Sequence, residues 1–420
     1  MNQRAVIIGI DGVPFRLMDD LSQQGVMPYF NQLRETGVFT QMASSIPEVS
    51  SVSWSSIITG KNPGEHSIYG FTELLPSTYT LSFPNSKKLK ANPFWQNQGE
   101  FCIINVPSTY PASSLNGVLV SGFISPDLER AVYPTSLLEI LNEFHYKVDV
   151  DTKKARKFPM VLFKELFEAL ESRVAFSHYL WEKIPWNVFM LVFTGSDRLG
   201  HFLWDAYEDE SHEYHSQFLQ FFSRIDEAIR DFGEKMNPED ALFIVSDHGM
   251  EQTQVNVNVN CVLEQEGFLH RGKDPRKGYS NIQEGTRAFA LDPGRIYINK
   301  KGKFPRGCVE PGEEDAVLRE VCNAFESLEI QGQKAIAHVY ENHHIYHGPY
   351  SESGPDLVLM PARGINLKGG ILAETPFDQN VLSGKHTQKD AFLFVCGDCS
   401  ISENPTVEDV VPLLAECLGW

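Results

Sequence analysis

The sequence AVIIGIDG, residues 5–12, places an acidic side chain directly after a short apolar run. Such a run, ended by a polar turn, is typical of a buried strand in a parallel sheet. In open α/β sheets, ligands bind beyond the carboxyl ends of the strands. Asp11 is therefore a candidate site residue, although an aspartate at this position more often serves in a turn or a helix cap.

The same kind of apolar run recurs along the chain and predicts the fold class. Further predicted core strands lie at residues 101–106, 188–193, 241–246, 356–360 and 391–396. Between them, residues 159–184 and 212–232 carry Leu, Phe and Ile at helical spacing. This alternation predicts an α/β fold, with a central, mostly parallel sheet flanked by helices on both faces.

One region interrupts the alternation. Residues 252–354 are rich in loops, with a predicted hairpin at 287–299 and a helix near 313–328. We therefore expect a catalytic core made of residues 1–251 and 355–420. Residues 252–354 would form an inserted cap that selects the substrate.

Charge and composition limit the classes of partner and the cellular location. The chain has 36 basic and 55 acidic side chains, a net charge of −19, which disfavours nucleic acid and anionic membranes. It contains no run of 18 apolar residues and begins directly with a strand, so neither a membrane span nor a signal peptide is expected. Seven scattered cysteines suggest reduced thiols and a cytoplasmic location. The sequence does not indicate an oligomeric state.

Acidic and histidine side chains adjoin several of the predicted strands. Asp197 and His201 follow the strand at 188–193, and Asp247 and His248 follow the strand at 241–246, whereas His386 precedes the last one. Carboxylates and imidazoles together suit zinc, manganese or iron. Each residue alone has an ordinary structural explanation, but their joint placement predicts a metal centre at one edge of the sheet.

A serine-rich segment, SSVSWSSIITG at residues 50–60, predicts a helix start near Val52–Ile58. A serine at this start would lie in the positive end of the helix dipole, where phosphate binds, or would act only as a cap. The sequence has no G-x-S-x-G elbow, no P-loop and no strand-linked G-x-G-x-x-G.

Taken together, these segments resemble the alkaline phosphatase superfamily, and most closely its type I phosphodiesterase/nucleotide pyrophosphatase branch. The resemblance covers most of the chain and rests on seven segments in family order. These are GIDGVPFRLMDDL, SSVSWSSIITGKNPGEHSIYGF, FTGSDRLGHFLW, VSDHGM, RIYINKKGKFPRGCVEPGEE, HGPYSESGPDLVL and GKHTQKDAFLFVCG.

The resemblance implies a role for each candidate residue. It places the nucleophile at Ser50, counted back from Thr59-Gly60, with Ser51 as the alternative if the count shifts by one. One metal ion would be held by Asp11, Ser50, Asp247 and His248, and a second by Asp197, His201 and His386. The family usually carries two zinc ions, and some branches use manganese.

The sequence departs from the family pattern at one substrate-binding position. Nucleotide pyrophosphatases have an asparagine three residues after the nucleophile, where this chain has Ser53. A serine hydroxyl is shorter than the asparagine amide. Ser53, Arg198 and Lys385, together with Lys61, are the candidates for contacting the phosphate in its place.

The favoured function is therefore a two-metal phosphohydrolase that cleaves phosphodiester or pyrophosphate bonds through a phosphoseryl intermediate. Its substrate would be a small phosphorylated molecule, with a nucleotide as one candidate. One alternative is a metal-dependent phosphomonoesterase or phosphomutase of the same superfamily. Another is a non-catalytic, metal-stabilised binding protein. A sulfatase is disfavoured because no arginine follows the serines as that branch requires.

Overall fold

The computed structural model describes residues 3–152, 158–379 and 382–420, and the chain divides into two compact units. The first unit comprises Met1–Lys61, Asn85–Glu251 and His386–Trp420. The second comprises Asn62–Pro84 and Gln252–Lys385. Each unit has its own sheets and its own hydrophobic core, and each is described separately below.

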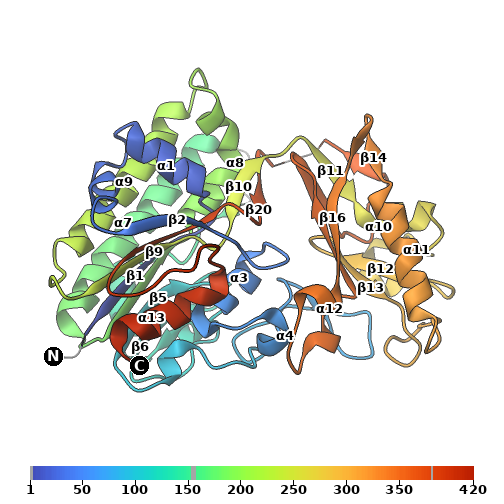
Figure 1. Ribbon diagram of the computed structural model, residues 1–420, viewed down its shortest axis with the longest axis horizontal. Helices are drawn as coiled ribbons and strands as arrows, with labels where there is room; N and C mark the ends of the chain where they lie inside the picture. Colours follow the sequence, from blue (N-terminus) through green and yellow to red (C-terminus); the bar gives the residue numbers. More distant parts are fainter. Residues whose placement is uncertain (1–2, 153–157, 380–381) are drawn as a thin grey trace. The chain divides into compact units, whose positions relative to one another are not determined.

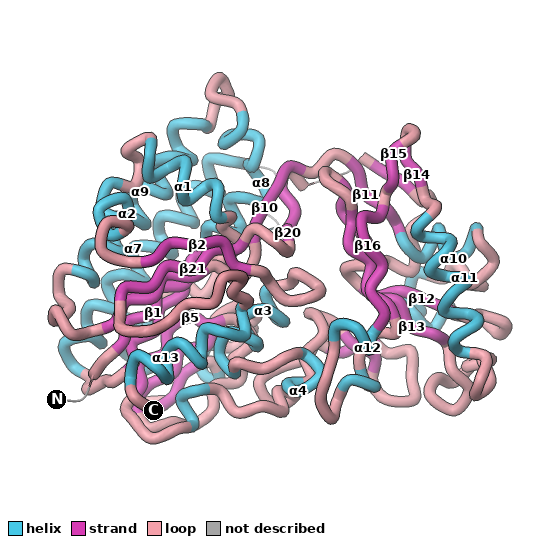
Figure 2. The backbone as a smooth tube through the Cα atoms, in the orientation of Figure 1, coloured by secondary structure: helices cyan, strands magenta, loops and turns pink. Residues whose placement is uncertain are grey.

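The first unit is built on an eight-stranded sheet within the described ranges, visible in Figures 1 and 2. In spatial order its strands are β2 (Val38–Met42), β21 (Ala391–Cys396), β9 (Ala241–Val245), β1 (Ala5–Ile10), β8 (Val188–Phe193), β5 (Phe101–Val106), β6 (Gly117–Ser121) and β7 (Val132–Tyr133). The strands from β9 to β6 are parallel, whereas β2, β21 and β7 run antiparallel to their neighbours. The mostly parallel sheet expected from the sequence is thus confirmed.

Helices cover both faces of this sheet because its central strands are apolar on both sides (Figure 1). One face packs against α1 (Phe15–Gln23), α2 (Pro28–Leu33), α5 (Leu137–Glu143), α7 (Pro159–Lys183), α8 (Gly195–Glu208) and α9 (His215–Gly233). The other face packs against α3 (Ser50–Thr59) and α13 (Val410–Leu418). Successive side chains of β1 alternate between these cores: Val6 and Ile8 join the first, and Ala5 and Ile7 the second.

The second unit holds smaller sheets around a separate core. A four-stranded antiparallel sheet contains β12 (Ala288–Leu291), β13 (Arg295–Ile298), β17 (Leu357–Pro361) and β16 (Ile336–Glu341), and a three-stranded sheet contains β18 (Ile365–Lys368), β11 (Val255–Asn258) and β19 (Phe377–Asp378). The unit also contains helices α4 (Pro63–His66), α10 (Val259–Gln265), α11 (Glu314–Glu326) and α12 (Asn342–Ile345), and hairpins β3 (Glu73–Leu74)–β4 (Leu81–Ser82) and β14 (Glu329–Ile330)–β15 (Gln333–Lys334). Strands β10 (Gly249–Gln252) and β20 (Gly384–Thr387), each of which has residues in both units, form a separate two-stranded sheet.

The second unit differs in extent from the expected insertion at 252–354. The apolar run at 356–360, expected in the core sheet, is instead β17, which pairs with β13 and β16. Residues 62–84 also belong here, because long-range contacts hold them. The buried guanidinium of Arg295 donates to the carbonyl of Thr72 at 2.8 Å, and the Tyr79 hydroxyl donates to Asn299 at 2.8 Å.

None of the helices in residues 3–152, 158–379 and 382–420 combines the length and apolarity needed to cross a bilayer.

Candidate active site

The first unit brings the predicted acids and histidines together. Asp11 follows β1, Asp247 and His248 follow β9, and Asp197 and His201 lie in the first two turns of α8, directly after β8. Since β9, β1 and β8 are adjacent and parallel, their carboxyl ends meet at one edge of the sheet. His386 lies in β20, just before the C-terminal strand β21.

The described part of the chain contains two candidate metal groups, and the first consists of Asp11, Asp247 and His248. One ligand atom of each lies within 4.8 Å of the others, and all three residues are buried. The Nε2 atom of His248 is 3.3 Å from Asp247 Oδ2 and 3.8 Å from Asp11 Oδ1. Two carboxylates and one imidazole at these distances can hold a single divalent cation.

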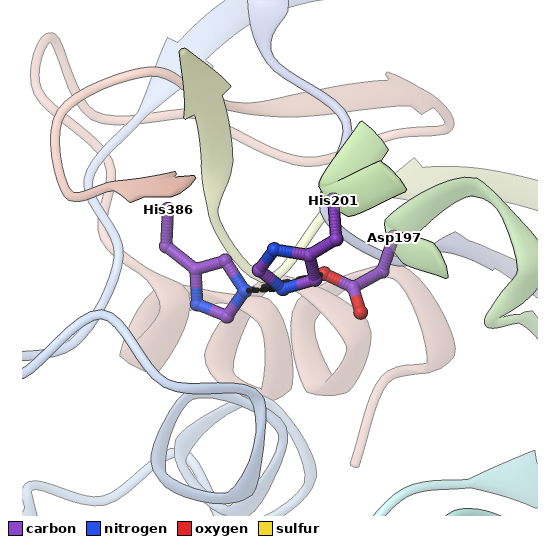
Figure 3. Close-up of side chains that lie close together, drawn as sticks. All are labelled: Asp197, His201 and His386. Atoms are coloured by element: carbon purple, nitrogen blue, oxygen red, sulfur yellow. Dashed lines mark hydrogen bonds and ion pairs between the residues drawn. The ribbon is translucent and has the colours of Figure 1, made fainter. Parts of the chain in front are cut away.

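The second candidate group contains Asp197, His201 and His386, shown in Figure 3. Asp197 Oδ1 is 3.4 Å from His201 Nε2 and 3.2 Å from His386 Nε2, and the two imidazole nitrogens are 2.9 Å apart. Asp197 and His201 face the same side because they are four residues apart on a helix. This group adjoins the first, since the rings of His248 and His386 stack with centroids 3.6 Å apart.

Backbone carbonyls fix the tautomers of two of these histidines. Nδ1 of His248 lies 3.0 Å from the carbonyl oxygen of Gly249, and Nδ1 of His386 lies 2.8 Å from that of Glu48. A carbonyl can only accept a hydrogen bond, so each Nδ1 carries the proton. Each Nε2 then directs its lone pair into the cluster, which is the usual arrangement of a metal-binding histidine.

The protonation equilibria of the cluster also fit bound cations. Burial, and then the neighbouring carboxylates, raise the pKa of Asp11 well above its usual range. Burial likewise raises the pKa of Asp247 to about 7, and its Oδ2 atom accepts no hydrogen bond from the described residues. Burial also raises the pKa of Asp197, but His201 and His386 outweigh it and hold that pKa well below its usual range. Cations would compensate this crowded negative charge.

The expected nucleophile lies next to the first group. Ser50 is the first residue of α3, so the helix begins two residues earlier than the sequence suggested. Its Oγ atom is 3.0 Å from His248 Nε2 and 3.5 Å from Asp11 Oδ1. Since burial lowers the pKa of His248 to about 4, its imidazole is neutral near pH 7, and its Nε2 atom accepts a hydrogen bond from the Ser50 hydroxyl. The hydroxyl of Ser51 is also buried but has no hydrogen-bond partner within the described chain.

Two of the expected phosphate-binding side chains are engaged inside the protein. The fully buried Ser53 hydroxyl bonds to those of Ser44 and Ser45, at 2.9 and 2.7 Å. The guanidinium of Arg198 is paired with Asp149 and Asp197. Lys385 is buried in β20, immediately before His386, and Lys61 follows α3 on the surface. The side chains of Ser53 and Arg198 are therefore engaged in contacts within the protein that hold the site together.

Two further side chains, which no sequence pattern indicated, lie at the site. The indole nitrogen of Trp54 donates to Asp11 Oδ2 at 2.8 Å, and Asp149 holds Arg198. Trp54 lies within the predicted helical segment Val52–Ile58, where an apolar side chain at helical spacing indicates only packing. Asp149 follows no predicted strand and lies 49 residues from its partner, so no spacing rule could pair them.

An α/β sheet that carries two such ligand groups beside a helix-terminal serine defines a hydrolase of the alkaline phosphatase superfamily. More specifically, the chain belongs to the type I phosphodiesterase/nucleotide pyrophosphatase family, whose family model matches residues 5–387. The family recognised from the sequence, and the hydrolase class it implies, are thereby confirmed. No curated protein sequence matches the chain.

Solved structures share the fold at low sequence identity. Phosphonoacetate hydrolase from Sinorhizobium meliloti 1021, in complex with phosphonoacetate, is 14% identical with a TM-score of 0.68, and the match covers 99% of this chain and 96% of that one. Inactive murine ectonucleotide pyrophosphatase/phosphodiesterase 5, in complex with AMP, is 14% identical with a TM-score of 0.60, covering 99% and 95% of the two chains.

Proposed function

We propose that the chain is a two-metal phosphohydrolase that cleaves phosphodiester or pyrophosphate bonds through a phosphoseryl intermediate. The observation that carries the proposal is the position of Ser50. Its Oγ atom lies at the N-terminus of α3 and within 3.5 Å of both His248 Nε2 and Asp11 Oδ1. The positive end of a helix dipole favours a bound phosphate group, and a serine at that end is placed to attack the phosphorus atom.

Two divalent cations would occupy the two groups. Asp11, Asp247 and His248, with Ser50, would hold one, and Asp197, His201 and His386 would hold the other. The mixed oxygen and nitrogen ligands favour zinc, with manganese as the alternative. When bound, such a pair supplies electrophilic stabilisation to the attacking and leaving oxygens of an in-line displacement.

The reaction would then consist of two successive displacements at phosphorus. The Ser50 Oγ atom bonds to phosphorus as the bond from phosphorus to the leaving oxygen breaks, and the hydroxyl proton passes through solvent to that oxygen, which departs as a hydroxyl group. Water then cleaves the phosphoseryl ester and restores the hydroxyl. The positive end of the α3 dipole, where Ser50 lies, would favour the negative charge of the transferred group.

Charge favours a phosphodiester over a simple monoester. Two divalent cations would exceed the charge of the three aspartates by only one. Arg198, a cation that adjoins the cluster, is already paired with Asp149 and Asp197. A dianionic monoester would bring one negative charge more than a singly charged diester to the same site. We therefore infer a small phosphorylated substrate with an esterified phosphate, and a nucleotide is a candidate because one structural relative binds AMP.

The proposal is tested by comparing a nitrophenyl phosphomonoester with a bis-nitrophenyl phosphodiester. Chelator-stripped protein would be assayed with no metal, with zinc and with manganese. We expect hydrolysis only with metal, and a higher kcat/KM for the diester. A preference for the monoester would instead support the phosphatase or phosphomutase alternative. If the protein bound two ions but hydrolysed neither nitrophenyl substrate nor a dinucleotide, the binding-protein alternative would be supported.

A further inference from the structure

The three carboxylates of the cluster share one hydrogen-bonding pattern. In each, a fixed donor of the protein holds one oxygen, and the other oxygen faces the histidines. For Asp247 the donor is the backbone N–H of Gly12, at 3.0 Å from Oδ1. For Asp11 it is the indole of Trp54, and for Asp197 it is the guanidinium of Arg198, each bonded to Oδ2.

Trp54 is held rigidly in this role. It lies one helical turn after Ser50 on α3 and is fully buried. Its ring packs so closely over Gly9 of β1 that a Cβ atom added there would lie 2.4 Å from it. An indole nitrogen can only donate, so the 2.8 Å bond fixes Asp11 Oδ2 and leaves Oδ1 directed at Ser50 and His248.

Arg198 is held by a different set of contacts. Its Nε and NH2 atoms bond to both oxygens of Asp149, at 3.1 and 2.7 Å, and its guanidinium lies 4.2 Å from the centre of the Phe123 ring. Its remaining nitrogen, NH1, donates to Asp197 Oδ2 at 3.2 Å. Because Asp149 balances the charge of Arg198, the pair acts on Asp197 chiefly through orientation.

We propose that Trp54 and Arg198 are positioning residues that set the metal affinities of the two groups separately. Trp54 orients Asp11 for the group with Asp247 and His248. Arg198, held by Asp149, orients Asp197 for the group with His201 and His386. This inference rests on the proposed two-metal function. Such outer contacts orient metal ligands, and losing one typically weakens binding about 10- to 100-fold.

The test measures metal affinity in proteins with one working group. A His386→Ala background reports on the Asp11 group, and an Asp247→Asn background reports on the Asp197 group. Metal-stripped protein would be titrated with Zn²⁺ in competition with a chromophoric chelator. Trp54→Phe removes the indole donor. The double change Arg198→Met with Asp149→Leu removes the guanidinium without leaving an unpaired buried charge.

We expect Trp54→Phe to weaken zinc binding about 10- to 100-fold in the first background and to leave the second unchanged, with the reverse for the double variant. Trp95→Phe is the matched control, because Trp95 is a buried tryptophan of the same core whose indole nitrogen has no hydrogen-bond partner among the described residues. Equal weakening of both groups, an effect as large from Trp95→Phe, or no effect at all would overturn the inference. If the unsubstituted protein itself bound fewer than two ions, the proposed function would fail instead.

Discussion

Replacing Asp247 with asparagine should stabilise the metal-free protein and weaken the metal-loaded one. Asp247 is fully buried, and its pKa is about 7 instead of the usual 3.8, chiefly because of burial. A pKa difference of about three units, at about 1.4 kcal/mol per unit, corresponds to roughly 4 kcal/mol as an upper bound. The folded carboxyl keeps its proton to higher pH than the unfolded one. The metal-free protein should therefore lose stability as pH rises from about 4 to about 7.

Asparagine keeps the oxygen that accepts from Gly12 N but does not titrate. Metal-free Asp247→Asn should thus lose less stability between pH 5 and pH 8 than the unsubstituted chain. All six tryptophans lie in the first unit, so their fluorescence during urea unfolding follows that unit. With zinc added the order should reverse, because the variant lacks a ligand. The exposed Asp398→Asn serves as the control, and parallel pH curves for the metal-free variant and parent would refute the reasoning.

Two further predictions concern the reaction itself. Ser50→Ala should lower diester hydrolysis by more than about a thousand-fold, because it removes the nucleophile. The Ser50→Ala variant should retain its metal ions, and Ser51→Ala should stay active. An active Ser50→Ala variant and an inactive Ser51→Ala variant would instead identify Ser51 as the nucleophile. His386→Ala should leave one tightly held ion per chain by elemental analysis, because only the Asp197 group loses a ligand; two retained ions would contradict that group.

The strands of the first unit were predicted well because each one is marked by a short apolar run in the sequence. Apolar runs such as 5–10 and 188–193 became strands with the expected bounds. The sequence does not show which sheet a buried strand joins. The prediction that residues 356–360 belong to the core sheet is therefore wrong, because this strand pairs with β16 in the second unit. The assignment of 62–84 to the second unit depends on contacts such as Arg295 with Thr72, which are 223 residues apart.

The candidate site followed the same rule. Asp11, Asp197 and Asp247 were visible because each follows a strand, and the fold then places strand ends together. The indole of Trp54 was hidden because its partner is 43 residues away and the helix pattern explained it as an apolar position. Arg198 was expected to face the substrate, since nothing in the sequence marked Asp149 as the acid that pairs with it.

The position of β21 has a consequence for biosynthesis. This strand, at residues 391–396, lies between β2 and β9, although both of those precede it in the chain. Until the ribosome has released it, β2 has no partner among the described strands and β9 presents an open edge. A chain that lacks β21 would thus expose the apolar edge of β9, where a strand of another molecule could pair with it.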